Sequence, residues 1–257
     1  MSATPTPEAR PPERGYDFSL ANPEWDYPPP AAAGVQYLIL SAPRSGSTML
    51  SSALVHSRRA GVPVEYFHYQ ELKKLGEAPP PDKVMAFFES VRRRRTTPNG
   101  VFGMKIHGGQ FRAPFMRPQM TQEGLDFLRR FSHVILITRQ DKIAQAMSYI
   151  RSVKTGLWNS SLASDRASSR YVFAEEDTPE LCRTMGVFKA DEIMWKALCS
   201  ALKLRVFHTT YEDLAANPPA VIGRTFNFLG LEYDGQMPTT QRISEDDYAS
   251  QKAQFLR

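Results

Sequence analysis

The sequence of 257 residues is poor in cysteine and lacks any long hydrophobic run. Its two cysteines, Cys182 and Cys199, give neither a disulfide framework nor the ligand spacing of a metal site, so we expect a reducing, cytoplasmic location. No stretch reaches the roughly 18 apolar residues that a membrane-spanning helix needs. Residues 1–30 contain no apolar core of a secretory signal. We therefore predict a protein that is neither transmembrane nor secreted.

The charge balance is basic but has no pattern typical of nucleic-acid binding. The formal net charge is +5, which favours anionic ligands in general. Because no basic stripe is interleaved with aromatic residues, we expect no nucleic acid partner. The one basic cluster, Arg92 to Arg95, ends a predicted helix, where cations complement the helix dipole. We interpret it as a solvated helix end, with an acidic partner or a membrane surface as the alternative.

Proline is concentrated at the N-terminus. Residues 1–34 hold eight of the twenty prolines and few aliphatic side chains, a composition that favours a poorly ordered or loosely docked tail. Tyr16 to Phe18 and Trp25 are its candidate anchors. Residues 35–257 are long enough for one domain with a full core.

Within residues 35–257, strand-like runs alternate with helical patterns. This alternation predicts an α/β fold, a single domain with a central, mostly parallel sheet flanked by helices. The expected strands are 37–41, 101–106, 133–138 and 204–209. The expected helices are 48–57, 83–95, 121–131, 141–154, 187–202 and 217–229. Residues 156–185 read as an irregular, polar segment, and a segment of that length is often a lid or substrate loop.

The turn after the first predicted strand has the features of an anion pocket. Three apolar residues lead into small and hydroxyl-bearing residues with one cation, and a helix follows. Backbone N–H groups at such a turn, together with the positive end of the helix dipole, attract an anion. The candidate residues are Arg44, Ser45, Gly46, Ser47 and Thr48.

This loop departs from the phosphate-binding pattern G-x-x-x-x-G-K-[ST]. Ser41 stands in place of the first glycine and Ser47 in place of the lysine. A loop without that lysine is poorly suited to a β/γ-phosphate with Mg²⁺, but it can clamp one terminal phosphate that carries a transferable group. An ordinary strand–turn–helix start is the alternative.

Further polar residues lie where other predicted strands end, and ligands of open α/β sheets bind outside those ends. Arg139 follows the third strand and Ser148 lies on the next helix. A guanidinium and a hydroxyl suit a second phosphate-sized anion; alternatively, Arg139 pairs with Asp141. Tyr211 follows the fourth strand, where it either packs on a purine or belongs to the core.

Three more residues are candidates for acid–base chemistry. Lys105 and His107 alternate along the second strand and so share one face, as a charge stabiliser and a base. An exposed lysine with a structural histidine is the alternative. Glu65 lies among apolar and aromatic neighbours, where desolvation would raise its pKa and suit it to general-base work. A merely solvated glutamate is the alternative.

Taken together, these motifs resemble the sulfotransferase superfamily. The resemblance rests on A-P-R-S-G-S-T at 42–48, Arg139 with Ser148, Y-E-D-L at 211–214, N-P at 217–218 and F-L-G at 228–230. The chain is more narrowly similar to the bacterial trehalose 2-sulfotransferase group, through V-E-Y-F at 64–67, T-P-N-G-V-F-G at 97–103 with Lys105, and residues 145–158. The similarity runs from about residue 36 to the C-terminus.

The resemblance implies a P-loop-like sulfotransferase fold, a homodimer and no metal. It also implies the donor 3′-phosphoadenosine 5′-phosphosulfate (PAPS) and a carbohydrate or glycolipid acceptor such as trehalose. The loop from Arg44 to Thr48 would then bind the 5′-phosphosulfate. Arg139 and Ser148 would bind the 3′-phosphate, and Tyr211 would lie near the adenine.

The resemblance leaves two candidates for the catalytic base. Glu65 matches the proposed base of the trehalose enzymes, whereas Lys105 to His107 is similar to the Lys-Thr-His of cytosolic sulfotransferases, in which the histidine is the base. The surrounding segments favour Glu65. Arg44 and Lys105 would stabilise charge on the leaving bisphosphate. The Arg-Lys-Gly segment of the cytosolic enzymes has no match, and Arg242 is the nearest basic candidate.

The alternatives differ in class. A sulfotransferase that acts on a non-sugar alcohol would use His107 as its base. A P-loop kinase is disfavoured by the missing lysine and by the lack of an aspartate at the end of the strand 133–138. A non-catalytic nucleotide-binding protein would leave Glu65 and His107 without a role.

Overall fold

The computed structural model describes residues 20–30, 32, 34–156, 158, 171–233 and 235. Its centre is a four-stranded parallel sheet in the order β2-β1-β3-β4. The strands are β1 (Gln36–Ser41), β2 (Phe102–His107), β3 (His133–Thr138) and β4 (Val206–Thr210). The predicted fold class is therefore confirmed, and each strand begins and ends within two residues of its expected bounds.

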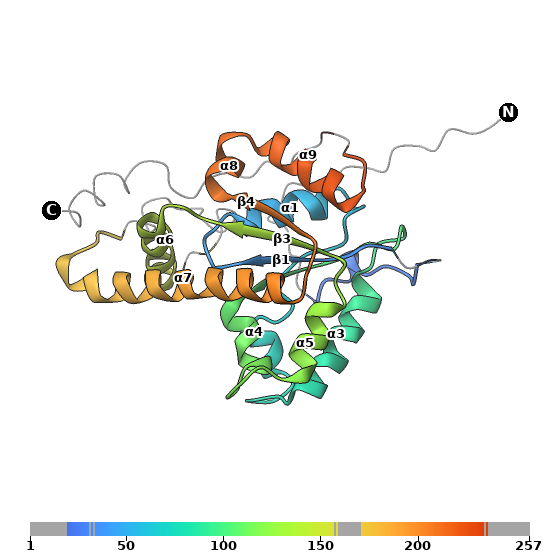
Figure 1. Ribbon diagram of the computed structural model, residues 1–257, viewed down its shortest axis with the longest axis horizontal. Helices are drawn as coiled ribbons and strands as arrows, with labels where there is room; N and C mark the ends of the chain where they lie inside the picture. The colour runs from blue at the N-terminus through green and yellow to red at the C-terminus, as the bar shows by residue number, and fades with distance from the viewer. Residues whose placement is uncertain are drawn as a thin grey trace.

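Helices cover both faces of this sheet (Figure 1). The α-helices are α1 (Ser47–His56), α2 (Tyr69–Lys73), α3 (Pro81–Arg95), α4 (Gly108–Phe115), α5 (Gln122–Arg129), α6 (Lys142–Thr155), α7 (Thr178–Ala201), α8 (Tyr211–Ala216) and α9 (Pro218–Leu229). Two single-turn 3₁₀ helices are η1 (Pro23–Trp25) and η3 (Glu175–Asp177). None of the helices in the described ranges is long and apolar enough to span a membrane.

The core forms because successive residues of β1 point to opposite faces. Leu38 and Leu40 pack into an aromatic-rich cluster with side chains of α3, α4, α5 and α7. Tyr37 and Ile39 pack on the other face, against α1 and α9. Figure 1 shows the same division, with α1, α8 and α9 on one side of the sheet and α3, α4 and α5 on the other. Both faces are buried, as a parallel sheet requires.

Three expectations about helices need correction. Residues 178–185 were expected in an irregular segment but form the first turns of α7, which begins at Thr178 instead of residue 187. The short helices α2 and α8 were not expected, and α8 ends at Ala216 before Pro218 begins α9. The helix α4 was not expected either, because it starts with two glycines and contains Pro114, and both residue types are unfavourable in helices. Tertiary packing stabilises it, because Phe111 and Phe115 are fully buried.

The basic cluster at the end of α3 is only partly the solvated helix end that the sequence suggested, because Arg93 and Arg94 are exposed but Arg95 is not. Arg95 is fully buried and pairs with Asp26 at 2.9 Å. Arg94 binds the other oxygen of that carboxylate at 2.8 Å. Trp25 is buried against Val55 and Val62, so its prediction as an anchor is confirmed. Residues 16–18, the other candidate anchor, lie outside the described ranges.

Candidate active site

The anion loop connects β1 to α1 at the carboxyl edge of the sheet. Its backbone turns through left-handed conformations at Arg44 (φ 60°) and Gly46 (φ 83°). Two observations favour glycine at position 46. Its φ is one that side chains with a Cβ rarely adopt, and an added Cβ would lie 2.9 Å from Cδ2 of Tyr211. Ser45 stays in the loop by donating to the carbonyl of Ala42 at 2.9 Å. The first N–H groups of α1 have no partner within the helix, so the turn has the form of an anion pocket.

Arg139 and Ser148 meet the loop from β3 and α6. Arg139 Nη1 donates to the carbonyl oxygen of Arg44 at 3.2 Å, and Arg44 Nε donates to Ser148 Oγ at 3.0 Å. The Arg139 guanidinium carbon lies 4.3 Å from the centre of the Tyr211 ring. Asp141, the alternative partner of Arg139, caps α6 by accepting from the backbone N–H of Ala144. Two guanidinium groups, a hydroxyl and an aromatic ring therefore adjoin one loop.

Side chains that sequence reasoning did not assign to the site hold this region together. Gln145 Nε2 donates to the carbonyl of Pro43 at 2.7 Å. Lys142 contacts Gln145 Oε1 at 3.2 Å, the Arg139 carbonyl and Glu192 of α7. Glu212 accepts from the backbone N–H groups of Gln140 and Asp141. Such contacts depend on the fold, since the partners come from four elements separated in sequence.

A second polar cluster lies beside the loop, at the end of β2. Lys105 Nζ is 2.9 Å from Glu65 Oε1 and donates to Thr48 Oγ1 at 3.0 Å. His107 Nε2 is 3.3 Å from the same glutamate oxygen. The prediction that Lys105 and His107 share a face is confirmed, and both side chains reach Glu65. Lys105 is only 4% exposed, so this ammonium is held between the carboxylate and the anion loop.

His107 is held at both ring nitrogens. Its Nδ1 lies 3.0 Å from Ser41 Oγ, and its Nε2 faces Glu65. His107 also occupies the N-cap of α4, where its backbone N–H donates to Gln110 Oε1 at 2.9 Å. The other end of that amide, Nε2, donates to Glu65 Oε2 at 2.7 Å. Gln110 is thus a further member of the cluster that the sequence did not reveal.

The expected pKa shift of Glu65 was wrong in sign. Burial raises the pKa of this carboxyl, as expected, but the charges and hydrogen bonds of Lys105 and His107 lower it more, and the net pKa lies well below its ordinary value. Glu65 is therefore a carboxylate over the whole neutral range.

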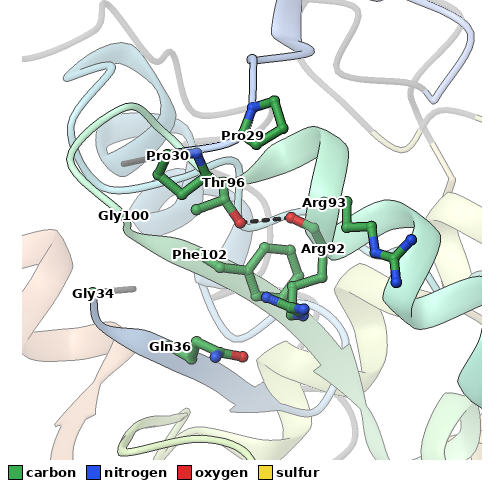
Figure 2. A pocket seen from close by; sticks show the side chains of 9 residues that line it. All are labelled: Pro29, Pro30, Gly34, Gln36, Arg92, Arg93, Thr96, Gly100 and Phe102. Carbon is green, nitrogen blue, oxygen red and sulfur yellow. Dashed lines mark hydrogen bonds between the residues drawn. The ribbon is translucent and has the colours of Figure 1, made fainter. Parts of the chain in front are cut away.

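A separate hollow of about 230 Å³ lies at the amino ends of β1 and β2, opposite the anion loop (Figure 2). It is lined by Pro29, Pro30, Gly34, Gln36, Arg92, Arg93, Thr96, Gly100 and Phe102. Arg92 uses its Nε for an ion pair with Glu89 at 2.9 Å. Figure 2 shows two prolines, a phenylalanine and two arginines here, with the Thr96 hydroxyl donating to the Arg92 carbonyl. None of the residues that line this hollow is a carboxylate or a histidine. Arg242, the remaining basic candidate, lies outside the described residues.

A loop with fixed cations beside a Glu–Lys–His cluster is an arrangement typical of group-transfer enzymes. The family model described as Stf0 sulphotransferase matches residues 36–253. The chain belongs to this family, and it is a sulfotransferase.

Two curated relatives support the narrower resemblance to the trehalose group. Both are named trehalose 2-sulfotransferase, from Mycobacterium tuberculosis (strain ATCC 35801 / TMC 107 / Erdman) and Mycolicibacterium smegmatis (strain ATCC 700084 / mc(2)155). Each is 26% identical to this chain, and the alignment covers 76% of this chain and 84% of the relative.

Solved structures are more distant. A sulfotransferase from Alicyclobacillus acidocaldarius is 15% identical, with a TM-score of 0.49, 87% of this chain covered and 90% of that one. The sulfotransferase domain from the curacin biosynthetic pathway is 16% identical, with a TM-score of 0.44 and coverage of 86% and 83%.

Proposed function

We propose that this enzyme transfers the sulfuryl group of PAPS to a hydroxyl of trehalose or a related sugar or glycolipid. The family assignment and the two relatives named trehalose 2-sulfotransferase support this reaction. The observation that carries the proposal is the position of Lys105, which joins the carboxylate of Glu65 to Thr48 of the anion loop. Because Lys105 contacts both, the proposed base adjoins the proposed donor site, as transfer between them requires.

The donor occupies the carboxyl edge of the sheet in this proposal. The loop from Arg44 to Thr48 holds the 5′-phosphosulfate, because its N–H groups and cation favour a terminal anion. Arg139 and Ser148 hold the 3′-phosphate, and Tyr211 lies near the adenine. The contacts among Arg44, Arg139 and Ser148 support this proposal, since the two proposed anion sites adjoin each other, as the two ends of one nucleotide require.

Transfer proceeds in line. The acceptor hydroxyl oxygen forms a bond to sulfur while the bond from sulfur to the bridging oxygen of the phosphosulfate breaks. The hydroxyl proton passes to the Glu65 carboxylate, and adenosine 3′,5′-bisphosphate leaves with the bridging electron pair. Arg44 and Lys105 stabilise the charge that develops on that oxygen.

The low pKa of Glu65 fits this role if Lys105 changes partners. The ammonium contacts both Glu65 and Thr48, so a phosphosulfate on the loop competes with the carboxylate for it. The Lys105 ammonium is the largest cause that lowers the pKa of Glu65. When Lys105 turns toward the donor, this charge no longer depresses that pKa, and the carboxylate becomes a stronger base. Base strength is then greatest when the donor is in place.

His107 is the competing base, with a non-sugar alcohol as the competing acceptor. Its two ring nitrogens lie next to Ser41 and Glu65, which favours a role in orienting the carboxylate. Variants decide between the two. Transfer of labelled sulfate from PAPS to trehalose should be lost in Glu65→Gln and retained in His107→Ala. The reverse pattern would assign the base to His107.

Calorimetry tests the donor separately. Adenosine 3′,5′-bisphosphate should bind without Mg²⁺, and Arg139→Ala should weaken that binding. Tight binding of Mg-ATP with no response to the bisphosphate would exclude a PAPS-dependent reaction and favour a kinase. A panel of sugars, glycolipids and simple alcohols with labelled donor identifies the acceptor class.

A further inference from the structure

Gln110 makes one side-chain contact that the capping of its helix does not require. It is the third residue of α4, after Gly108 and Gly109, and its side chain turns back over the helix N-terminus. Its Oε1 accepts from the backbone N–H of His107 at 2.9 Å, and its Nε2 donates to Glu65 Oε2 at 2.7 Å.

The hydrogen-bonding partners of the Gln110 amide determine which of its ends is the oxygen. A backbone N–H can only donate, so the end of the amide that faces His107 must be the oxygen. The nitrogen then necessarily faces Glu65 and can only donate to it. A flipped amide would oppose two N–H groups on one side and two oxygens on the other. The arrangement therefore favours an ionised, accepting Glu65.

The two oxygens of Glu65 have different surroundings. Lys105 and His107 of β2 both lie against Oε1, at 2.9 and 3.3 Å. Oε2 faces Gln110 of α4. Among the other charged side chains of α4 and α7, Arg112 and Asp191 pair with each other. Gln110 thus holds Oε2, the oxygen that Lys105 and His107 leave uncovered. Together with Lys105 it fixes the plane of the carboxylate.

We propose that Gln110 is the positioning residue for Glu65: its amide, set by the backbone of His107, orients the carboxylate that receives the acceptor proton. This rests on the proposed function. If Lys105 turns to the donor, Gln110 and His107 are the contacts that keep Glu65 in place during transfer, and only Gln110 holds Oε2. Gln110 touches neither the donor nor the reacting atoms in this proposal, and it acts through Glu65.

Helix capping is the competing explanation, and one substitution separates the two. Gln and Glu serve equally at this position of a capping box, because only the oxygen facing His107 is needed. Gln110→Glu therefore keeps the cap but replaces the donor toward Glu65 with a second carboxylate. Gln110→Met removes both contacts at similar volume. Thr121→Ala, which removes the side-chain cap of a different helix, α5, is the matched control for loss of a cap.

The first measurement is steady-state sulfate transfer across pH. In Gln110→Met we expect kcat to fall about ten- to hundred-fold, the range spanned by one hydrogen bond to a charged group, with little change in KM for the donor. In Gln110→Glu we expect a deeper loss at neutral pH and partial recovery in acid, where the two carboxylates share one proton. Wild-type kcat in Gln110→Glu at all pH values would overturn the proposal, and so would a loss in Thr121→Ala as large as in Gln110→Met.

The second measurement does not depend on the reaction. The carboxyl ¹³C resonance of Glu65, assigned with Glu65→Gln, gives its pKa in the donor-free protein. Loss of the Nε2–H donor in Gln110→Met should move this titration upward, because the donor stabilises the charged form. An unmoved titration would show that Gln110 does not hold the carboxylate. An upward shift together with an active Glu65→Gln enzyme would keep the contact and refute only Glu65 as the base.

Discussion

The ion pair between Lys105 and Glu65 should be measurable as a coupling in the stability of the protein. Lys105 is 4% exposed, so Lys105→Met removes a buried charge and leaves Glu65 with His107 and Gln110 as its partners. Removing one partner of a buried pair costs about 3–5 kcal/mol. The Glu65 side chain is 26% exposed, and water screens part of the loss, so we expect about 1–3 kcal/mol of destabilisation at pH 7.

The same pair has a defined pH dependence. The folded pKa of Glu65 lies well below its unfolded value, chiefly because Lys105 and His107 outweigh the effect of burial. The pair therefore stabilises the fold above an unfolded pKa of about 4.3, and this contribution is lost as the pH falls through the folded pKa. The difference in the free energy of unfolding between wild type and Lys105→Met should accordingly be largest at neutral pH and shrink below about pH 4.

A double-mutant cycle in urea checks both statements. Wild type, Lys105→Met, Glu65→Gln and the double variant are unfolded at pH 7 and at low pH. We expect a coupling energy of about 1–2 kcal/mol at pH 7, because residues in direct contact do not act additively. A coupling near zero at pH 7, or one that stays the same in acid, would refute the ion-pair reasoning.

Three further predictions concern other parts of the molecule. Gly46→Ala should weaken binding of adenosine 3′,5′-bisphosphate, measured by calorimetry, and should destabilise the fold by about 1–3 kcal/mol. The reason is that φ at this position is 83° and the new Cβ would lie 2.9 Å from Cδ2 of Tyr211. Arg139→Lys should weaken the same binding roughly ten-fold or more while retaining the charge, since lysine has no planar fork to pair with a phosphate and to lie over Tyr211; unchanged affinity would remove Arg139 from the donor site. Trp25→Ala should destabilise by about 3–5 kcal/mol in thermal or urea unfolding and leave kcat unchanged, because Trp25 is buried against Val55 and Val62.

The fold could be predicted because its main elements follow local rules. The strand cores of β1 and β3 are uninterrupted apolar runs, which is typical of a strand buried on both faces. Five of the six expected helices lie within two residues of their observed bounds, and α7 differs at its start. The helix α4 could not be found in this way, because its glycines and Pro114 argue against a helix and its stability comes from aromatic partners on other elements.

The site was predictable to the extent that its residues lie at the ends of strands. Arg44, Lys105, His107 and Arg139 each follow or end a strand, and parallel strands bring those ends to one edge of the sheet. The residues that support them were not predictable, since Gln110, Gln145 and Lys142 act through partners supplied by other elements. Arg95 was misread for the same reason: its partner Asp26 lies 69 positions earlier in the chain.

The wrong sign predicted for the pKa shift of Glu65 shows that the residues next to it in the sequence do not determine its pKa. Its apolar neighbours in sequence correctly indicated desolvation, which raises the pKa. The opposing charge comes from Lys105, forty positions away, and the sign of the shift depends on where that one ammonium lies. Because Lys105 also contacts Thr48 of the anion loop, the strength of the proposed base is a property of the donor site as much as of Glu65. An empty loop leaves Glu65 paired and weakly basic, and an anion on the loop competes for the same ammonium. Measured at the Glu65 carboxyl, the pKa should therefore rise when adenosine 3′,5′-bisphosphate and sulfate bind, and a fall or no change would place Lys105 on the carboxylate throughout.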